Sequence, residues 1–137
     1  EKSYKLVGRE MSIEYAALES GLDRFVHLNK GEFKGRQGLK EWQQCGFSNT
    51  FVTMIVHSVK DADVLGNNPI YHNGELVGRA TSGGYGFRIN ESLALAMVRP
   101  EAAAEGTKLT IEILGESYDA TICEESPFDP QNERPRA

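Results

Sequence analysis

Long hydrophobic runs are missing from this chain of 137 residues. No apolar stretch approaches the roughly 18 residues that a membrane-spanning helix needs. The first residues also lack the charged, apolar and small-residue parts of a secretory signal peptide. The sequence therefore predicts no membrane partner. Because the first residue is Glu1 rather than methionine, we expect the chain to be a piece of a larger polypeptide.

The chain also has no excess of basic over acidic residues. Lys and Arg number 15 against 20 Asp and Glu, which gives a net charge of -5. A protein that binds a nucleic-acid backbone needs a basic stripe, so no nucleic-acid partner is predicted. The net charge leaves a small acidic ligand open, because a local basic pocket can form on an acidic protein.

Cysteine and histidine are scarce, and neither follows a metal-binding pattern. Cys45 and Cys123 are far apart and match no metal or redox spacing, so we expect free thiols in a reducing compartment. The three histidines, His27, His57 and His72, each stand alone, without an HxH or HExxH pattern. No metal site is predicted.

What the sequence does contain is a strand-like alternation of apolar and polar residues from Thr50 onward. The predicted strands span residues 51–57, 70–72, 76–81, 85–89, 93–98, 109–114 and 117–123, with a strand remnant at 1–11. Asn73-Gly74 has the composition of a two-residue hairpin turn, and Gly115-Glu116 is predicted as a second. We expect a mainly β fold, a six- to seven-stranded antiparallel barrel that is closed or nearly closed.

A short helical connector is predicted before the barrel. Ser12 can cap a helix that Gly21 would end, and residues 35–44 are predicted as a second helix, with a short strand at 25–28 between them. A length of 137 residues predicts one domain. We divide it into a connector at 1–47, a barrel at 48–128 and a surface tail at 129–137, whose prolines cannot extend a central strand.

The glycine-rich stretch from Val77 to Val98 is the most informative part of the chain. Gly83, Gly84 and Gly86 allow a positive φ or a close approach of another chain or ligand. They predict either a barrel corner or a ligand-approach loop, and no dinucleotide fingerprint, because no helix follows them. Ser82 is outside any Gly-x-Ser-x-Gly pattern, so its hydroxyl is expected to satisfy turn amides.

Basic residues gather around two glycines before the second predicted helix. Lys30, Lys34 and Arg36 flank Gly31 and Gly35. From the residues alone, this cluster is either the solvated start of a helix or a tether for an anion such as a ligand carboxylate.

Taken in order, several short motifs resemble the C-terminal part of the aminomethyltransferase family, which includes the T-protein of the glycine cleavage system. They are Glu19-Ser20-Gly21-Leu22, Phe33-Lys34-Gly35-Arg36 with Leu39, Val77-Gly78 with Thr81-Ser82-Gly83, Leu93-Ala94-Leu95-Ala96, Gly106-Thr107-Lys108-Leu109 and Pro127-Phe128. Ser20 and Lys34 depart from the family pattern. Residues 83–88 and the tail at 128–134 look most like the rear part of FAD-linked sarcosine or dimethylglycine dehydrogenases and oxidases.

The resemblance implies a one-carbon reaction shared between domains. An N-methyl amine would be oxidised on FAD in the front half of the polypeptide, and its one-carbon unit captured on tetrahydrofolate. The upstream folate and FAD domains of the same polypeptide are the implied partners, with residues 1–47 a remnant of the folate-binding domain. The catalytic aspartate lies outside this chain, so the chain alone is expected to be inactive. The implied location is the bacterial cytoplasm or the mitochondrial matrix.

The same resemblance implies three folate-contacting residues. Glu1 matches a glutamate that contacts the pterin, Lys30 a basic residue near the folate, and Arg134 a basic residue near its glutamate tail. Two alternatives stay open: a free-standing aminomethyltransferase of the glycine cleavage system, and a purely structural barrel module.

Overall fold

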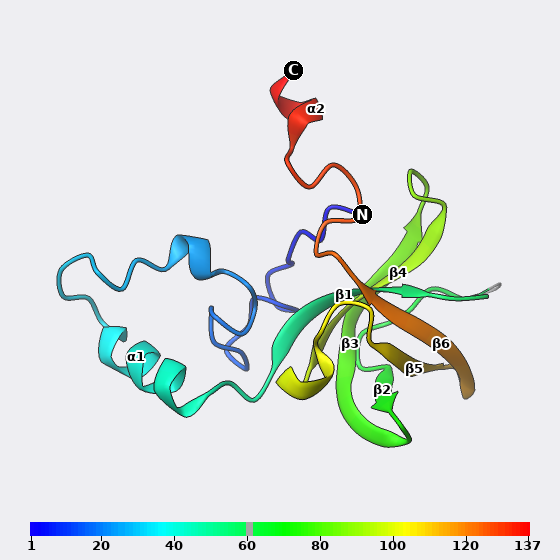
Figure 1. Ribbon diagram of the computed structural model, residues 1–137, viewed down its shortest axis with the longest axis horizontal. Helices are drawn as coiled ribbons and strands as arrows, with labels where there is room; N and C mark the ends of the chain where they lie inside the picture. Colours follow the sequence, from blue (N-terminus) through cyan, green and yellow to red (C-terminus); the bar gives the residue numbers. More distant parts are fainter. Residues whose placement is uncertain (60–61) are drawn as a thin grey trace.

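A closed barrel of six antiparallel strands forms the body of the computed structural model, which describes residues 1–59 and 62–137 (Figure 1). The strands follow the order β1-β4-β3-β2-β5-β6, and β1 pairs with β6 to close the barrel. They are β1 (Thr50–Val56), β2 (Pro69–His72), β3 (Glu75–Gly86), β4 (Glu91–Val98), β5 (Lys108–Ile113) and β6 (Glu116–Cys123). This confirms the predicted mainly β barrel.

The barrel interior is filled by the apolar residues of each strand. In β5 the inward residues Leu109, Ile111 and Ile113 are buried, while Thr110 and Glu112 between them are not. Fully burying one such side chain contributes about 1.5–3 kcal/mol. Alanines on β3, β4 and β6 keep the interior narrow; they are Ala80, Ala94, Ala96 and Ala120. Because the sheet closes on itself, it has no free edge strand.

Two short hairpin turns join neighbouring strands. At the β2–β3 turn Asn73 and Gly74 have φ of 52° and 82°, as the two-residue turn requires. At the β5–β6 turn the two residues with positive φ are Leu114 (52°) and Gly115 (85°). The predicted Gly115-Glu116 turn is therefore wrong by one residue, because Glu116 already pairs with Ile113 in the ladder.

β3 is a single long strand rather than the two predicted pieces at 76–81 and 85–89. A β-bulge interrupts its pairing with β4 between Ala80 and Ser82, so the extra residue, Thr81, turns the strand around the barrel. None of Gly83, Gly84 and Gly86 has a positive φ. Close packing explains Gly83 and Gly86 better: a Cβ on Gly83 would lie 2.5 Å from Val64 Cβ, and one on Gly86 would lie 2.9 Å from Glu1 Cγ. Gly84 has open space around it.

The connector contains less regular structure than predicted. Its only α-helix among the described residues is α1 (Arg36–Cys45), which confirms the second predicted helix. A 3-10 helix, η1 (Asp23–Phe25), replaces the strand predicted at 25–28. The helix predicted to start at Ser12 is absent; the Ser12 hydroxyl accepts the Glu14 N–H at 3.2 Å and closes a local turn instead.

Turns and loops dominate the first 20 residues because two buried carboxylates, Glu10 and Glu19, accept hydrogen bonds from backbone N–H groups there. Residues 1–11 form no strand and contribute one isolated bridge, Val7 to Met11. Glu19 accepts the N–H groups of Ala16 and Asn49, both at 2.9 Å. These bonds fasten the loop to the start of β1 and give its amides the partners that a helix would otherwise supply.

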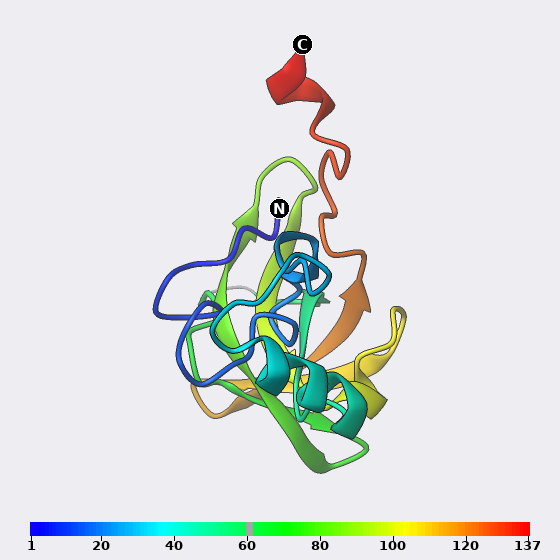
Figure 2. The ribbon, with the colours of Figure 1, turned by 90° about the vertical axis from the view of Figure 1, so that its left-hand side faces the viewer.

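The segment that follows β6 returns to the start of the chain. The Phe128 N–H donates to the Glu1 carbonyl at 3.2 Å, and the Ser126 hydroxyl donates to the Lys2 carbonyl at 3.0 Å. The tail adds no strand, as predicted, and ends in the short helix α2 (Glu133–Arg136), which stands away from the barrel in both views (Figures 1 and 2). The short 3-10 helix η2 (Pro100–Ala102) links β4 to β5. Within the described ranges, no helix has the length and apolarity that a bilayer crossing demands.

Candidate functional site

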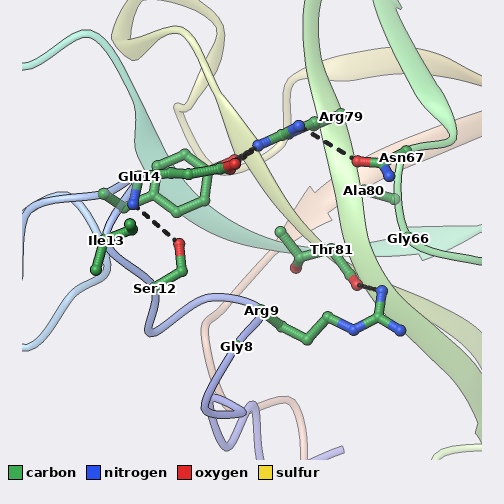
Figure 3. Close-up of a pocket in the computed structure, with 11 residues that line it drawn as sticks. Gly8, Arg9, Ser12, Ile13, Glu14, Gly66, Asn67, Arg79, Ala80 and Thr81 are labelled. Carbon is green, nitrogen blue, oxygen red and sulfur yellow. Dashed lines mark hydrogen bonds and ion pairs between the residues drawn. The ribbon is translucent and has the colours of Figure 1, made fainter.

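A cavity of about 310 Å³ lies where the N-terminal loop crosses the bulge of β3 (Figure 3). Its walls come from the N-terminal loop, from the segment before β2 and from β3: Gly8, Arg9, Ser12, Ile13, Glu14, Tyr15, Gly66, Asn67, Arg79, Ala80 and Thr81. Figure 3 shows Arg79 and Arg9 on either side of Thr81. The bulge determines this position, because it turns the strand at the point where the loop crosses.

Arg79 ties the loop to the barrel. Its Nε and Nη2 donate to the Tyr15 hydroxyl at 3.0 and 2.8 Å, and its Nη1 donates to Asn67 Oδ1 at 3.3 Å. Nη2 also forms an ion pair with Glu14. The hydrogen bonds to Tyr15 and the charge of Glu14 raise the pKa of Arg79, so this guanidinium holds its charge and has few donors left for a ligand.

Arg9 lies on the opposite side of the bulge and donates fewer hydrogen bonds than Arg79 does. Its Nη1 donates to the Thr81 carbonyl at 3.3 Å. The guanidinium lies against Gly66, where a Cβ would be 2.1 Å from Nη1. Residue 66 must therefore be small for Arg9 to reach β3.

Glu10 is the central polar residue beneath the bulge, and it is fully buried. Its Oε2 accepts the Leu6 N–H at 2.8 Å, and its Oε1 accepts the hydroxyls of Thr81 and Ser82, the latter at 3.0 Å. Burial raises the pKa of the Glu10 carboxyl, but hydrogen bonds from Thr81, Leu6 and Ser82 outweigh it, so the pKa is lowered overall. A buried, ionised carboxylate therefore lies beneath the bulge, next to the cavity but not among the residues that line it.

Sequence reasoning missed Glu10 and misassigned Ser82. The Ser82 hydroxyl donates to Glu10 rather than to a turn amide. The Thr81-Ser82 pair was visible in the sequence, but its partner is 71 residues upstream of Thr81. Only the fold brings the two together.

Stability is expected to fall in acid because of Glu10. The folded pKa lies below the ordinary value of 4.5, so the unfolded chain binds this proton more readily. The stabilisation is therefore complete above about pH 4.5 and is lost as the pH falls through the folded pKa. Urea unfolding of the chain between about pH 7 and pH 3 measures this loss.

Glu10→Gln should flatten part of this acid dependence, since it removes the titrating group. Asp129 contributes to the acid dependence in the same direction. Burial raises the pKa of its carboxyl, but hydrogen bonds from the Glu133 N–H and Lys2 outweigh burial, so the pKa is lowered overall. An unchanged acid slope in Glu10→Gln would contradict the assignment.

The three residues that the resemblance singled out lie in different surroundings. Glu1 is half-buried, and its Oε1 accepts the N–H groups of Arg88 and, at 3.3 Å, Ile89 in the β3–β4 turn. Lys30 is exposed with its ammonium 5.0 Å from the Phe33 ring centre. Arg134 is exposed on α2 and lies 5.1 Å from the Phe128 ring centre.

These three residues are not brought together within the described chain. The segment between η1 and α1, which carries Lys30, lies well apart from α2 in both views (Figures 1 and 2). No described hydrogen bond joins any two of Glu1, Lys30 and Arg134. A ligand that touches all three would have to be long, or part of its site must come from outside these residues.

A second cavity, of about 460 Å³, opens beside Glu1. Tyr4 and Tyr85 line it together with Gly83, Gly84 and Leu93. The Tyr85 and Phe87 rings meet edge to face with centres 5.1 Å apart. Glu1, Lys2, Ser3 and Ser82 also line the cavity, so its walls combine aromatic and apolar groups with polar and charged ones, a composition that suits a flat polar ring.

Within residues 1–59 and 62–137, no group of three or more His, Cys, Asp or Glu residues is placed to hold an ion. Cys45 is exposed and Cys123 half-buried, and both are free thiols. Burial raises the pKa of the Cys123 thiol.

Comparison with known proteins places this geometry in a family. Residues 50–129 match the glycine cleavage T-protein C-terminal barrel domain. The chain is 37% identical to dimethylglycine dehydrogenase of Rattus norvegicus over 126 residues, which is 91% of this chain and 15% of that protein. The human protein of that name is 38% identical over the same length. The aminomethyltransferase of Synechocystis sp. is 35% identical over 120 residues, 85% of this chain and 31% of that protein.

A solved structure shows the same fold. The crystal structure of glycine cleavage system aminomethyltransferase T from Bartonella henselae superposes with a TM-score of 0.80 at 21% identity, covering 90% of this chain and 35% of that chain. The present chain thus spans about a seventh of the dehydrogenases and a third of the aminomethyltransferases that it matches. It belongs to the glycine cleavage T-protein C-terminal barrel domain family and corresponds to the C-terminal region of aminomethyltransferase-like proteins, dimethylglycine dehydrogenase among them.

Proposed function

We propose that this chain is the C-terminal, folate-handling region of an FAD-linked N-methyl amine oxidoreductase that passes a one-carbon unit to tetrahydrofolate. The observation that carries the proposal is the higher identity to the dimethylglycine dehydrogenases, 37–39%, than to the aminomethyltransferases, 32–35%. In this proposal residues 1–47 complete a folate-binding domain, 48–128 form the barrel and 129–137 the tail. The location is the bacterial cytoplasm or the mitochondrial matrix.

Glu1 is the proposed pterin contact on this chain. Its Oε1 is engaged by the β3–β4 turn, while Oε2 accepts no hydrogen bond from the described residues. A free carboxylate oxygen beside Tyr4 and Tyr85 suits a ring that presents N–H donors. The remaining walls of the folate site, and the whole FAD site, are assigned to the preceding part of the natural polypeptide.

Lys30 and Arg134 are proposed as outlying contacts for the folate carboxylates. Both carry exposed cations, whose attraction to an anion is screened by salt. Each is therefore expected to contribute less than Glu1. The contribution of both should weaken as the ionic strength rises.

The proposal is tested with the natural protein that carries this chain. Supplied with dimethylglycine or sarcosine and tetrahydrofolate, it should form 5,10-methylenetetrahydrofolate at the expense of free formaldehyde. Formaldehyde released in unchanged yield after tetrahydrofolate is added would contradict the proposal.

Affinity for tetrahydrofolate tests the assigned residues. Glu1→Ala should weaken binding about tenfold, since it removes a charge-assisted hydrogen bond, and Lys30→Ala and Arg134→Ala should weaken it less. Arg99→Ala is the matched control, because Arg99 is an exposed arginine paired with Glu75 elsewhere on the barrel. Calorimetry measures all four variants.

One observation favours the structural alternative. The Glu1 carboxylate already holds the β3–β4 turn through two backbone amides, a role that needs no ligand. If all three variants bind tetrahydrofolate like the unchanged protein, Glu1 serves this turn alone and the barrel is a structural module.

A further inference from the structure

Arg9 has more hydrogen-bond donors than the described residues supply with acceptors. A guanidinium carries five N–H donors, but Arg9 forms one bond with the described residues, from Nη1 to the Thr81 carbonyl at 3.3 Å. None of the ion pairs among those residues includes Arg9. The other arginine of the cavity, Arg79, is paired with Glu14. Among the described residues that line the cavity, Arg9 is therefore the cation that has no counter-charge.

Neutral donors line the same cavity. The Ser12 hydroxyl accepts the Glu14 N–H, and the Tyr15 hydroxyl accepts two bonds from Arg79, but neither hydroxyl donates to a described residue. The side-chain carbonyl of Asn67 accepts from Arg79, which leaves the amide N–H groups of Asn67 without an acceptor among the described residues. The cavity has a surplus of donors, so a ligand that completes it must supply acceptors.

The fold holds these donors in place. A Cβ on residue 66 would lie 2.1 Å from Arg9 Nη1, so the guanidinium rests against a glycine that leaves room for it. The Asn67 N–H donates to the Ala80 carbonyl at 2.8 Å, and the Ala80 N–H donates to the Asn68 carbonyl at 2.9 Å. These two bonds fasten the segment before β2 to β3. Donors that are already positioned lower the entropic cost of binding.

We propose that this cavity binds a small organic monocarboxylate, whose oxygens pair with the guanidinium of Arg9. A planar guanidinium matches a carboxylate through two parallel N–H···O bonds. The volume of about 310 Å³ is at the lower end of the range for ligand sites, so it suits a small molecule. Ile13 also lines the cavity and offers an apolar wall for a short hydrocarbon chain. Figure 3 shows the N-terminal loop, the segment before β2 and β3 surrounding this space.

The charges around the cavity favour one negative charge on the ligand over two. Arg79 and Glu14 neutralise each other, and Arg9 adds one positive charge. The buried carboxylate of Glu10 lies beneath the cavity, where it accepts the Thr81 hydroxyl. The second charge of a divalent anion such as sulfate would have no partner and would be repelled by Glu10.

The proposed carboxylate site goes beyond the proposed function. Glu1, Lys30 and Arg134 do not line this cavity. Binding of a carboxylate at Arg9 is also measured without reading folate binding or one-carbon transfer. Each of the two proposals can therefore fail without the other.

Binding of propionate to the natural full-length protein, followed by ligand-observed NMR, tests the site. The measured quantity is the change in dissociation constant between the unchanged protein and each variant, because other sites of a full-length protein can also bind a carboxylate. Arg9→Gln should weaken binding about fivefold, and Arg9→Lys should restore part of the loss, because it keeps the charge without the planar fork. Unchanged propionate binding in Arg9→Gln would overturn the proposal.

Two controls accompany this measurement. Arg99→Gln makes the same change of charge at an exposed arginine that does not line the cavity, and it should leave propionate binding unchanged. Sulfate should bind at Arg9 more weakly than propionate does. An equal loss in Arg99→Gln, or tighter Arg9-dependent binding of sulfate, would overturn the assignment of a carboxylate site.

Arginine modification gives a second readout that needs no substitution. Phenylglyoxal reacts with exposed guanidinium groups, and peptide mass mapping locates the modified residues. Saturating propionate should slow the modification of Arg9 severalfold and leave that of Arg99 unchanged. Equal rates at Arg9 with and without propionate would overturn the proposal. An Arg9 that resists modification even without propionate would overturn it too, because another part of the polypeptide would then fill the cavity.

Discussion

Gly78→Ala is expected to destabilise the barrel by about 3 kcal/mol and to lower its melting temperature by roughly 10 °C. A Cβ at Gly78 would lie 2.3 Å from the Met97 carbonyl oxygen and 2.8 Å from the Val98 Cα. Both are backbone atoms of the paired strand β4, so the clash cannot be relieved by turning a side chain. Thermal unfolding followed by circular dichroism measures the effect.

Gly84→Ala provides the control within the same strand. A Cβ there meets nothing within 4 Å, and Gly84 has no positive φ. This variant should be neutral or more stable by a few tenths of a kcal/mol, because alanine restricts the unfolded chain. Equal melting temperatures for the two variants would contradict the packing explanation of the glycine motif.

Glu10→Ala is expected to cost about 3 kcal/mol of folding free energy. The change removes a buried carboxylate that accepts the Leu6 N–H and the hydroxyls of Thr81 and Ser82. Those donors then lose their partner, and the loop of residues 6–15 keeps only the contacts of Arg9 and Arg79 to hold it to the barrel. Urea unfolding at neutral pH measures the loss, which Glu10→Gln should share only in part, because its amide keeps one acceptor oxygen.

Glu14→Ala is the matched control for Glu10→Ala. Glu14 is exposed and pairs with the partly exposed Arg79, and such surface pairs contribute up to about 1 kcal/mol. A loss in Glu14→Ala as large as in Glu10→Ala would show that the loop depends on its surface ion pair rather than on the buried carboxylate.

Features that depend on neighbouring residues could be predicted from the sequence. The Asn73-Gly74 turn, the alternation in β5 and the helix α1 each follow from residues within one turn or strand, and the structure confirms all three. The structure of the N-terminal region could not be predicted in this way, because the carboxylates of Glu10 and Glu19 accept hydrogen bonds from its backbone N–H groups. Nothing within a short window distinguishes these two glutamates from exposed ones.

The candidate site was less predictable for the same reason. Thr81-Ser82 stood out in the sequence, but the bulge that exposes both hydroxyls to Glu10 arises from a register shift between β3 and β4. Glu1, Lys30 and Arg134 came from the family resemblance, and their roles stay a proposal, since the described residues do not bring these three side chains together.

The closure of the barrel by β1 and β6 has a consequence for how the chain reaches this structure. Thr53 pairs with Cys123, 70 residues away, so this last seam joins the two ends of the sheet across almost the whole barrel sequence. Non-local pairing of this kind is entropically costly and slows folding. Until the seam forms, β1 and β6 are open edges that can pair with strands of other molecules. Folding yield should therefore fall as chain concentration rises, because more chains meet while those edges are still open.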